Sequence, residues 1–67
     1  MMRKNLIGEM AKARIKINDI ATLLDINRNS VHNKLFGNGD FTFKQALLIA
    51  DKYFPDTDLR WLFATSE

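Results

Sequence analysis

The sequence predicts one all-α domain, a compact arrangement of five helices that spans residues 1–67. Apolar residues recur three and four positions apart in successive segments, which is the spacing of one helix face. No segment alternates apolar and polar residues for long enough to predict a strand. A chain of 67 residues that is 46% apolar can bury one core, and no repeat or linker divides it.

Two helices are predicted in the first third of the chain. The first covers about residues 5–13, and Asn5 is the expected cap, because its side chain can accept from the free backbone N–H groups of the first turn. The second covers about residues 17–24. Asp19 lies in its first turn, where the helix dipole favours negative charge.

A third helix is predicted after a tight turn. Asp25 interrupts the apolar pattern and Ile26 restarts it, so the turn falls between the second helix and its successor. Asn27 stands at the position of an N-cap, which starts the third helix at about residues 28–36. Gly37 is the expected first residue beyond its C-terminus.

The segment "TFKQ" at residues 42–45 predicts the start of a fourth helix, at about residues 43–54. It reads as a capping box, in which the Thr42 hydroxyl accepts from the N–H of Gln45 and the Gln45 side chain reaches back. Pro55 stops this helix, since proline has no N–H to donate. The expected buried stripe consists of Phe43, Leu47, Ala50 and Phe54.

A short fifth helix is predicted at about residues 57–63, with Asp56 or Thr57 as its cap. So short a helix cannot bury all of its apolar side chains in so small a domain. We therefore expect a contact with a second subunit near this helix. The residues expected there are Trp61, Leu62 and Phe63.

Composition excludes several classes of protein. The chain has no cysteine and a single histidine, His32, and it shows no catalytic set or phosphate-loop motif, so we expect no enzyme, metal site, cofactor or small-molecule substrate. No apolar run is long enough to span a bilayer, which predicts a cytoplasmic protein without a membrane partner. Residues 1–44 hold eight Lys or Arg against four Asp or Glu, a balance of +4, and are the expected partner of an anion such as nucleic acid.

Residues 17–36 predict a helix-turn-helix unit. Ala21 is small enough for two helices to approach, and Asp25 tolerates the left-handed conformation that the turn needs. On the third helix, at about 100° per residue, four polar side chains fall within an arc of roughly 140°, and the apolar anchors Val31 and Leu35 point away from it. Its members are Arg28, Asn29, His32 and Asn33. Arginine can pair bidentately with guanine and asparagine with adenine, so the arc is suited to reading bases, and a merely solvated face is the alternative.

The sequence resembles the Xre/Cro/CI-type helix-turn-helix family, which includes lambdoid phage repressors and Cro. The resemblance extends from Ile7 to about Phe63. It rests on "DIATLLDINRNSVHNKLFG", on "TFKQALLIADKYF" and on the closing "LRWLF". It implies a lambda-repressor-like DNA-binding fold and a homodimer on double-stranded DNA.

The resemblance also implies roles for individual side chains. The base-reading positions of the family fall on Arg28, Asn29 and Asn33, with His32 close by. Its phosphate contacts fall near Asn18, Asn38, Thr42 and Lys44. We also expect phosphate contacts from Asn27, Ser30 and Lys34, and a solvated charge is the alternative for Lys34.

The chain departs from the family pattern at several positions. The glutamine that commonly opens the second helix is Ile17, so that phosphate contact is not expected in this chain. Two glycines of the family, between the first two helices and in the turn, are Arg14 and Asp25. A frequent buried Arg–Glu pair falls on Met10 and Leu35, which predicts a hydrophobic contact in its place.

The expected function is that of a sequence-specific DNA-binding regulator of transcription, a phage or bacterial repressor or Cro-like protein. A homodimer would place two copies of the third helix in successive major grooves of a pseudo-palindromic operator. The expected location is the bacterial cytoplasm, at the nucleoid when bound. The alternative is a protein-interaction module of the same fold, of antitoxin or anti-repressor type, which does not read DNA sequence.

Overall fold

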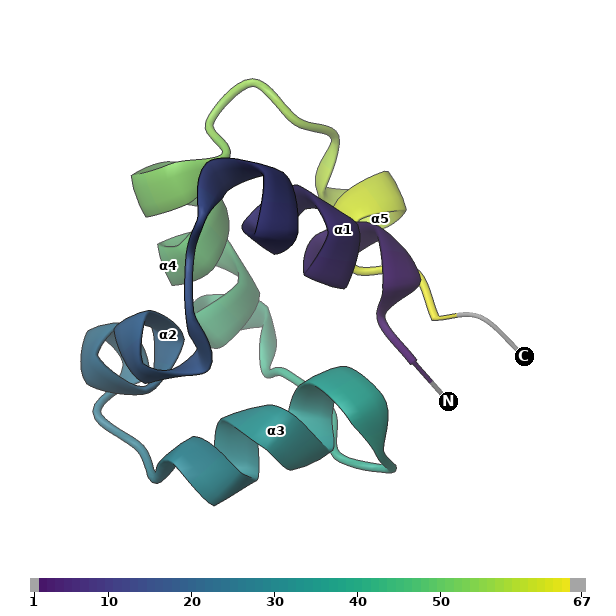
Figure 1. Cartoon of the computed structure of the whole chain (residues 1–67). Coiled ribbons are helices and arrows are strands. Elements are labelled where there is room, and N and C mark those ends of the chain that lie inside the picture. The colour runs from purple at the N-terminus through teal and green to yellow at the C-terminus, as the bar shows by residue number, and fades with distance from the viewer. Residues whose placement is uncertain (1, 66–67) are drawn as a thin grey trace.

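The computed structural model describes residues 2–65, which form five helices and the turns and loops that connect them (Figure 1). These are α1 (Lys4–Ala13), α2 (Ile17–Leu24), α3 (Arg28–Phe36), α4 (Phe43–Tyr53) and α5 (Leu59–Leu62). The predicted all-α class is confirmed, and α2 and α3 have the predicted bounds. Among residues 2–65, no helix is both long and apolar enough to cross a membrane.

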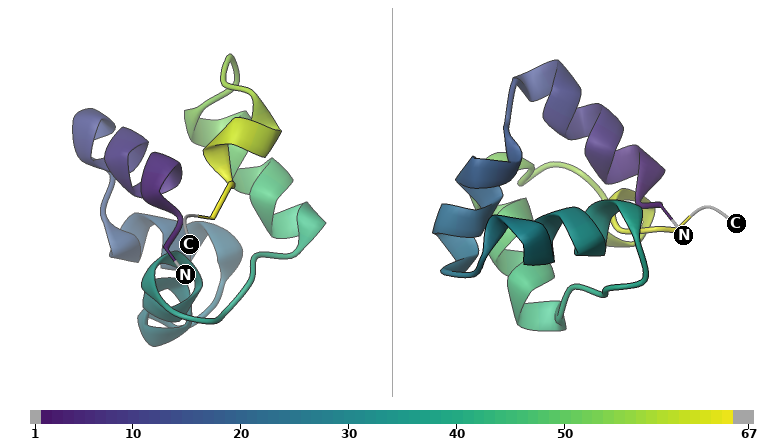
Figure 2. Two further views of the ribbon diagram at one scale, coloured as in Figure 1. Left: turned by 90° about the vertical axis from the view of Figure 1, so that its right-hand side faces the viewer. Right: turned by 60° about the horizontal axis from the view of Figure 1, so that its bottom comes forward.

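All five helices contribute to one core. The right-hand view of Figure 2 shows α3 crossing in front of α4, with α2 at one end of α3 and α1 above it. Burying each large apolar side chain contributes roughly 1.5–3 kcal/mol. The largest fully buried side chains are Leu6, Ile20, Val31, Leu35, Ile49 and Leu62. Met10 is also buried in this core. Both residues of the predicted hydrophobic contact, Met10 and Leu35, are therefore core residues.

Helices α1 and α2 end in the same way, on a residue with left-handed backbone. Arg14 follows α1 with φ of 58°, and Asp25 follows α2 with φ of 56°. After α2, the N–H of Asp25 donates to the carbonyl of Thr22, and the N–H of Ile26 donates to that of Ala21. This is the Schellman pattern, which pairs carbonyls that a helix end leaves free. The prediction for Asp25 is confirmed, and Arg14 takes the same conformation.

Glycine at either position is expected to stabilise the domain. A side chain in left-handed backbone costs about 1–2 kcal/mol, which exceeds the entropy that glycine adds to the unfolded chain. We expect Arg14→Gly and Asp25→Gly each to raise the free energy of unfolding by about 0.5–1 kcal/mol, measured by urea denaturation. The control is Ala13→Gly at the last residue of α1, which should lower it by a similar amount. A loss of stability in Arg14→Gly would contradict the assigned backbone.

The start of α1 differs from the prediction. The helix begins at Lys4, and Asn5 lies inside it rather than capping it. The Asn5 side chain instead donates to the carbonyl of Trp61, 2.8 Å away, which ties α1 to α5. The prediction that Asn5 caps α1 is wrong. Asparagine favours N-cap positions, but its amide can equally link two helices, as it does here.

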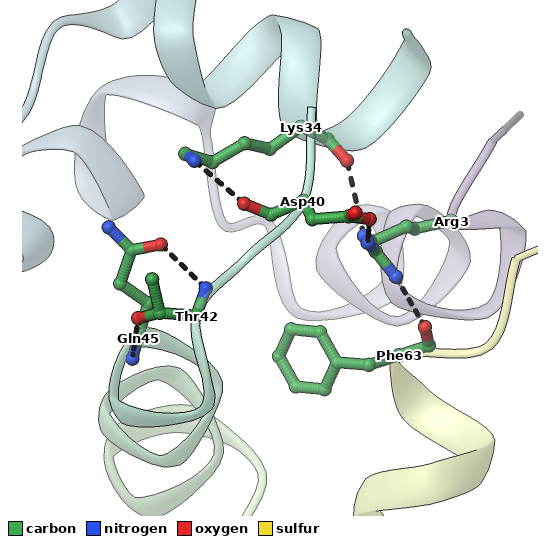
Figure 3. A network of polar contacts seen from close by, with 6 residues as sticks. All are labelled: Arg3, Lys34, Asp40, Thr42, Gln45 and Phe63. Atoms are coloured by element: carbon green, nitrogen blue, oxygen red, sulfur yellow. Dashed lines mark hydrogen bonds and ion pairs between the residues drawn. The ribbon is translucent and has the colours of Figure 1, made fainter. Parts of the chain in front are cut away.

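Arg3, which the sequence pattern does not single out, connects three parts of the chain (Figure 3). Its side chain donates to the carbonyls of Lys34 and Phe63 and to the carboxylate of Asp40, 2.7 Å away. Its guanidinium lies 5.4 Å from the centre of the Phe41 ring. Only 7% of Arg3 is exposed, so these contacts satisfy a charged group that is almost fully buried.

Helix α4 starts as predicted but buries a different stripe. Thr42 and Gln45 form both bonds of the capping box, at 3.1 and 3.0 Å (Figure 3). The predicted stripe is wrong at Phe43, which is 71% exposed, and at Leu47, which is partly exposed. The buried residues are Ala46, Ile49 and Ala50, because α4 packs on α2 and α5 with that side. The helix ends at Tyr53, and Phe54 is buried just beyond it.

Helix α5 is shorter than predicted and has another cap. Asp58, rather than Asp56 or Thr57, accepts from the N–H of Trp61 at 3.2 Å. Leu62 is completely buried in the core. The prediction that Leu62 contacts a second subunit is therefore wrong: the chain itself covers this side chain.

Candidate nucleic-acid interface

Helix α3 is anchored on one side and leaves a row of polar side chains exposed on the other. Val31 and Leu35 are buried, and Asn27 caps the helix through a 2.7 Å bond from the N–H of Asn29 to its side-chain oxygen. The four predicted base-reading residues are all exposed, and within residues 2–65 their side chains make no hydrogen bond or ion pair. They are Arg28, Asn29, His32 and Asn33. Their donors and acceptors are available to a ligand.

Phe36 belongs to the same face, although its apolar character favours the core. It is 38% exposed, and its ring centre lies 4.8 Å from that of His32, one helical turn earlier. At about 100° per residue, the direction of Phe36 around the helix axis falls between the directions of His32 and Asn29. This angular position could have predicted that Phe36 lies on the polar face. An exposed aromatic ring among polar groups adds an apolar contact to the face.

The loop after α3 lies against Asn33. Gly37 follows α3 as predicted, with its N–H donating to the carbonyl of Asn33 at 2.9 Å. A Cβ atom on Gly37 would overlap the amide oxygen of Asn33, and one on Gly39 would lie 3.0 Å from the amide nitrogen. A side chain at Gly37 or Gly39 would therefore displace the amide group of Asn33. Neither glycine is required for left-handed backbone, since their φ angles are not positive.

The N-terminal ends of α2 and α3 come together. Asn18 on α2 and Arg28 on α3 line the same two surface depressions. One of these depressions is a groove between α1 and α3, which is described below. Lys16, at the N-cap of α2, lines one of them and adds a second cation. Backbone N–H groups at a helix start favour anions, so this end of the face is suited to a phosphate.

The remaining predicted phosphate residues lie in different settings. Lys34 donates from its ammonium group to the carbonyl of Asp40 at 2.8 Å, and Thr42 uses its hydroxyl to cap α4 (Figure 3). Asn27 uses its side-chain oxygen on α3. The other three are exposed, and no hydrogen bond from their side chains is found in the described part of the chain: Ser30, Asn38 and Lys44.

A groove of about 370 Å³ opens between α1 and α3, next to this face. Its apolar lining is formed by Ile7, Met10, Ile15, Ile17, Leu35 and Phe36. Arg28 and Asn18 also line it, so the groove is continuous with the polar end of the face.

The residues predicted near a subunit contact on α5 are separated by the fold. Trp61 is 47% exposed, whereas Leu62 is buried. Phe63 packs edge-on against Phe41, with 5.5 Å between ring centres. Only Trp61 of the three presents a large apolar surface to solvent.

Comparisons of the chain with known proteins found no match. No family model matches the sequence, and no curated protein or solved structure matches the chain. Within residues 2–65, no group of three or more His, Cys, Asp or Glu side chains could hold a metal ion. The features that bear on function are thus the exposed face of α3, the adjoining start of α2 and the groove.

Proposed function

We propose that the protein is a sequence-specific DNA-binding regulator that reads the major groove with α3. The observation that carries this proposal is the row of four exposed side chains that make no hydrogen bond or ion pair within residues 2–65, on a helix whose other side is fixed in the core. Arg28 and Asn33 would contact base edges, because a guanidinium matches guanine and an amide matches adenine. Asn29, His32 and Phe36 would contact neighbouring bases.

Phosphate contacts would orient the protein on the duplex. Asn18 and Lys16 lie beside Arg28 at the start of α2, and the amide and ammonium groups of these two side chains would contact a phosphate. Ser30 and Asn38 would contact the backbone on the other side of the reading helix. Two subunits would bind a pseudo-palindromic operator and, by occupying it, would exclude RNA polymerase. The protein would act in the cytoplasm of a bacterial host.

The salt dependence of DNA binding tests this proposal. The test measures the affinity of the purified protein for a fluorescent duplex of random sequence. The logarithm of this affinity should fall linearly with the logarithm of the salt concentration. A dimer with several phosphate contacts per subunit would lose ~10³-fold between about 50 and 200 mM salt. Fluorescence anisotropy measures this loss directly. A folded protein that does not bind duplex DNA at about 50 mM salt would exclude the proposal.

Arg28→Ala is expected to weaken binding to the preferred site by about 1–3 kcal/mol and to relax the preference at one base pair per half-site. The reason is the loss of a bidentate contact to a base edge. The matched control is Arg60→Ala, which removes an exposed arginine from α5 and should leave sequence preference unchanged. Equal losses in both variants would mean that Arg28 contributes charge alone, without base readout.

One observation favours a second function, a protein-interaction module of antitoxin or anti-repressor type. The groove between α1 and α3 is mainly apolar, as expected of a site for a protein segment. Such a module would show no steep salt dependence toward DNA. The titration that tests the first function therefore also separates the two.

A further inference from the structure

Helix α4 leaves an apolar row on its outer side that the core does not use. Phe43 is 71% exposed and Leu48 is 41% exposed, and Leu47 is similarly accessible. Single exposed apolar side chains are normal on a protein surface. Phe43, Leu47 and Leu48 fall within an arc of about 140° on one helix, and exposed apolar side chains gathered in this way mark contact sites.

Two opposite charges lie within this row at symmetric positions. Lys44 precedes Leu47 by three residues, and Asp51 follows Leu48 by three residues. At about 100° per residue, Lys44 and Asp51 point in nearly the same direction, midway between the directions of the two leucines. Neither charge has a hydrogen-bond or ion-pair partner within residues 2–65.

We propose that this face of α4 binds a second copy of the chain, with the two α4 helices antiparallel. A two-fold axis passing beside the Leu47–Leu48 peptide would bring Lys44 opposite Asp51 of the partner subunit, and the reverse. Leu47 and Leu48 would each meet their own counterpart beside the axis. A parallel arrangement would place lysine on lysine and aspartate on aspartate, so the charges select the antiparallel pair.

This interface assigns a new role to Lys44. The family resemblance implies a phosphate contact for Lys44, but its position opposite Asp51 of the partner subunit would pair it within the dimer. Trp61 on α5 has no part in this contact. The use of the dimer on DNA rests on the proposed function, whereas the contact itself can be measured without DNA.

Sedimentation equilibrium of the purified full chain tests the proposal. The wild type should form a dimer, and Leu48→Glu should weaken it at least about 100-fold, because two charges would enter an apolar contact. Lys44→Asp and Asp51→Lys should each weaken it about tenfold, and the variant that carries both changes should return to near the wild-type value. Circular dichroism confirms that each variant is folded, which is expected because all three positions lie outside the core.

Trp61→Glu is the matched control for the contact that was predicted at α5. It should leave the dimer constant unchanged, since it changes an exposed aromatic residue of α5 that lies outside the proposed contact. The proposal is overturned if the wild type stays monomeric at about millimolar concentration, since a constant near 1 mM corresponds to only about 4.1 kcal/mol of binding. It is also overturned if Trp61→Glu abolishes the dimer while Leu48→Glu does not, or if the doubly exchanged variant is weaker than both single variants.

DNA titration distinguishes this result from the proposed function. If the α4 contact fails, a monomer that still binds duplex DNA with a steep salt slope keeps the proposed function. If the contact holds and DNA is not bound, the dimer stands and the proposed function does not.

Discussion

Leu35→Glu is expected to remove a large part of the stability of the protein and to lower its melting temperature strongly. Leu35 is 1% exposed and lies on the buried side of α3, so a carboxylate there would be charged and unpaired. The expected cost is about 4 kcal/mol or more. That cost is comparable with the whole stability of a domain of this size, roughly 3–10 kcal/mol. Thermal unfolding followed by circular dichroism measures the loss.

Two further variants isolate the reason for this loss. Leu35→Met keeps the volume and apolar character and should cost less than about 1.5 kcal/mol. Met10→Arg added to Leu35→Glu should recover part of the stability, because the two residues line the same groove. An unchanged melting temperature in Leu35→Glu alone would refute the placement of α3 in the core.

Arg3→Met is expected to lower the free energy of unfolding by about 2–4 kcal/mol. Methionine retains the apolar stem of the side chain but donates no hydrogen bonds. The carbonyls of Lys34 and Phe63, near the ends of α3 and α5, would then lose their donor. Urea denaturation gives the change, and hydrogen exchange should show earlier opening of α5, which Arg3 links to the rest of the chain.

The matched control separates the carbonyl contacts from the ion pair. Asp40 is largely exposed, so its pairing with Arg3 is screened by water. Asp40→Asn should therefore cost less than about 1 kcal/mol. A cost for Asp40→Asn equal to that for Arg3→Met would assign the stabilisation to the ion pair rather than to the two carbonyl contacts.

Local signals place α2, α3 and the start of α4, but not the caps of α1 and α5 or the buried side of α4. Asp25 breaks the apolar pattern and Asn27 caps the next helix, so the turn can be placed from neighbouring residues alone. Arg3 cannot be found in this way, because its partners lie 31 to 60 residues away in the sequence. Long-range contacts of this kind leave no mark on local spacing.

The prediction of the buried stripe on α4 is wrong for a similar physical reason. Two sets of apolar positions on this helix have helical spacing, one beginning at Phe43 and one at Ala46. Which set is buried depends on where α2 and α5 pack, and periodicity does not contain that information. The same limit applies to Leu62, whose burial follows from the direction in which α5 docks on α1 and α4.

The candidate site is more predictable than the core, because exposure of a polar arc follows from the burial of the opposite side. Arg28, Asn29 and His32 lie exposed on α3 as expected. The approach of Gly37 and Gly39 to Asn33 could not be predicted, since it depends on the path of the loop in space. For Phe36, residue type favours the core, whereas its angular position favours the exposed face on which it lies.

Selection of bound duplexes from a random-sequence DNA library, with the purified full chain, tests the central claim most directly. We predict enrichment of an inverted repeat whose half-sites are centred about one helical turn apart, about 10 base pairs or a multiple of it. Arg28→Ala should change the base preference at one position of each half-site. A folded protein that enriches no sequence over the starting library would contradict sequence-specific reading by α3.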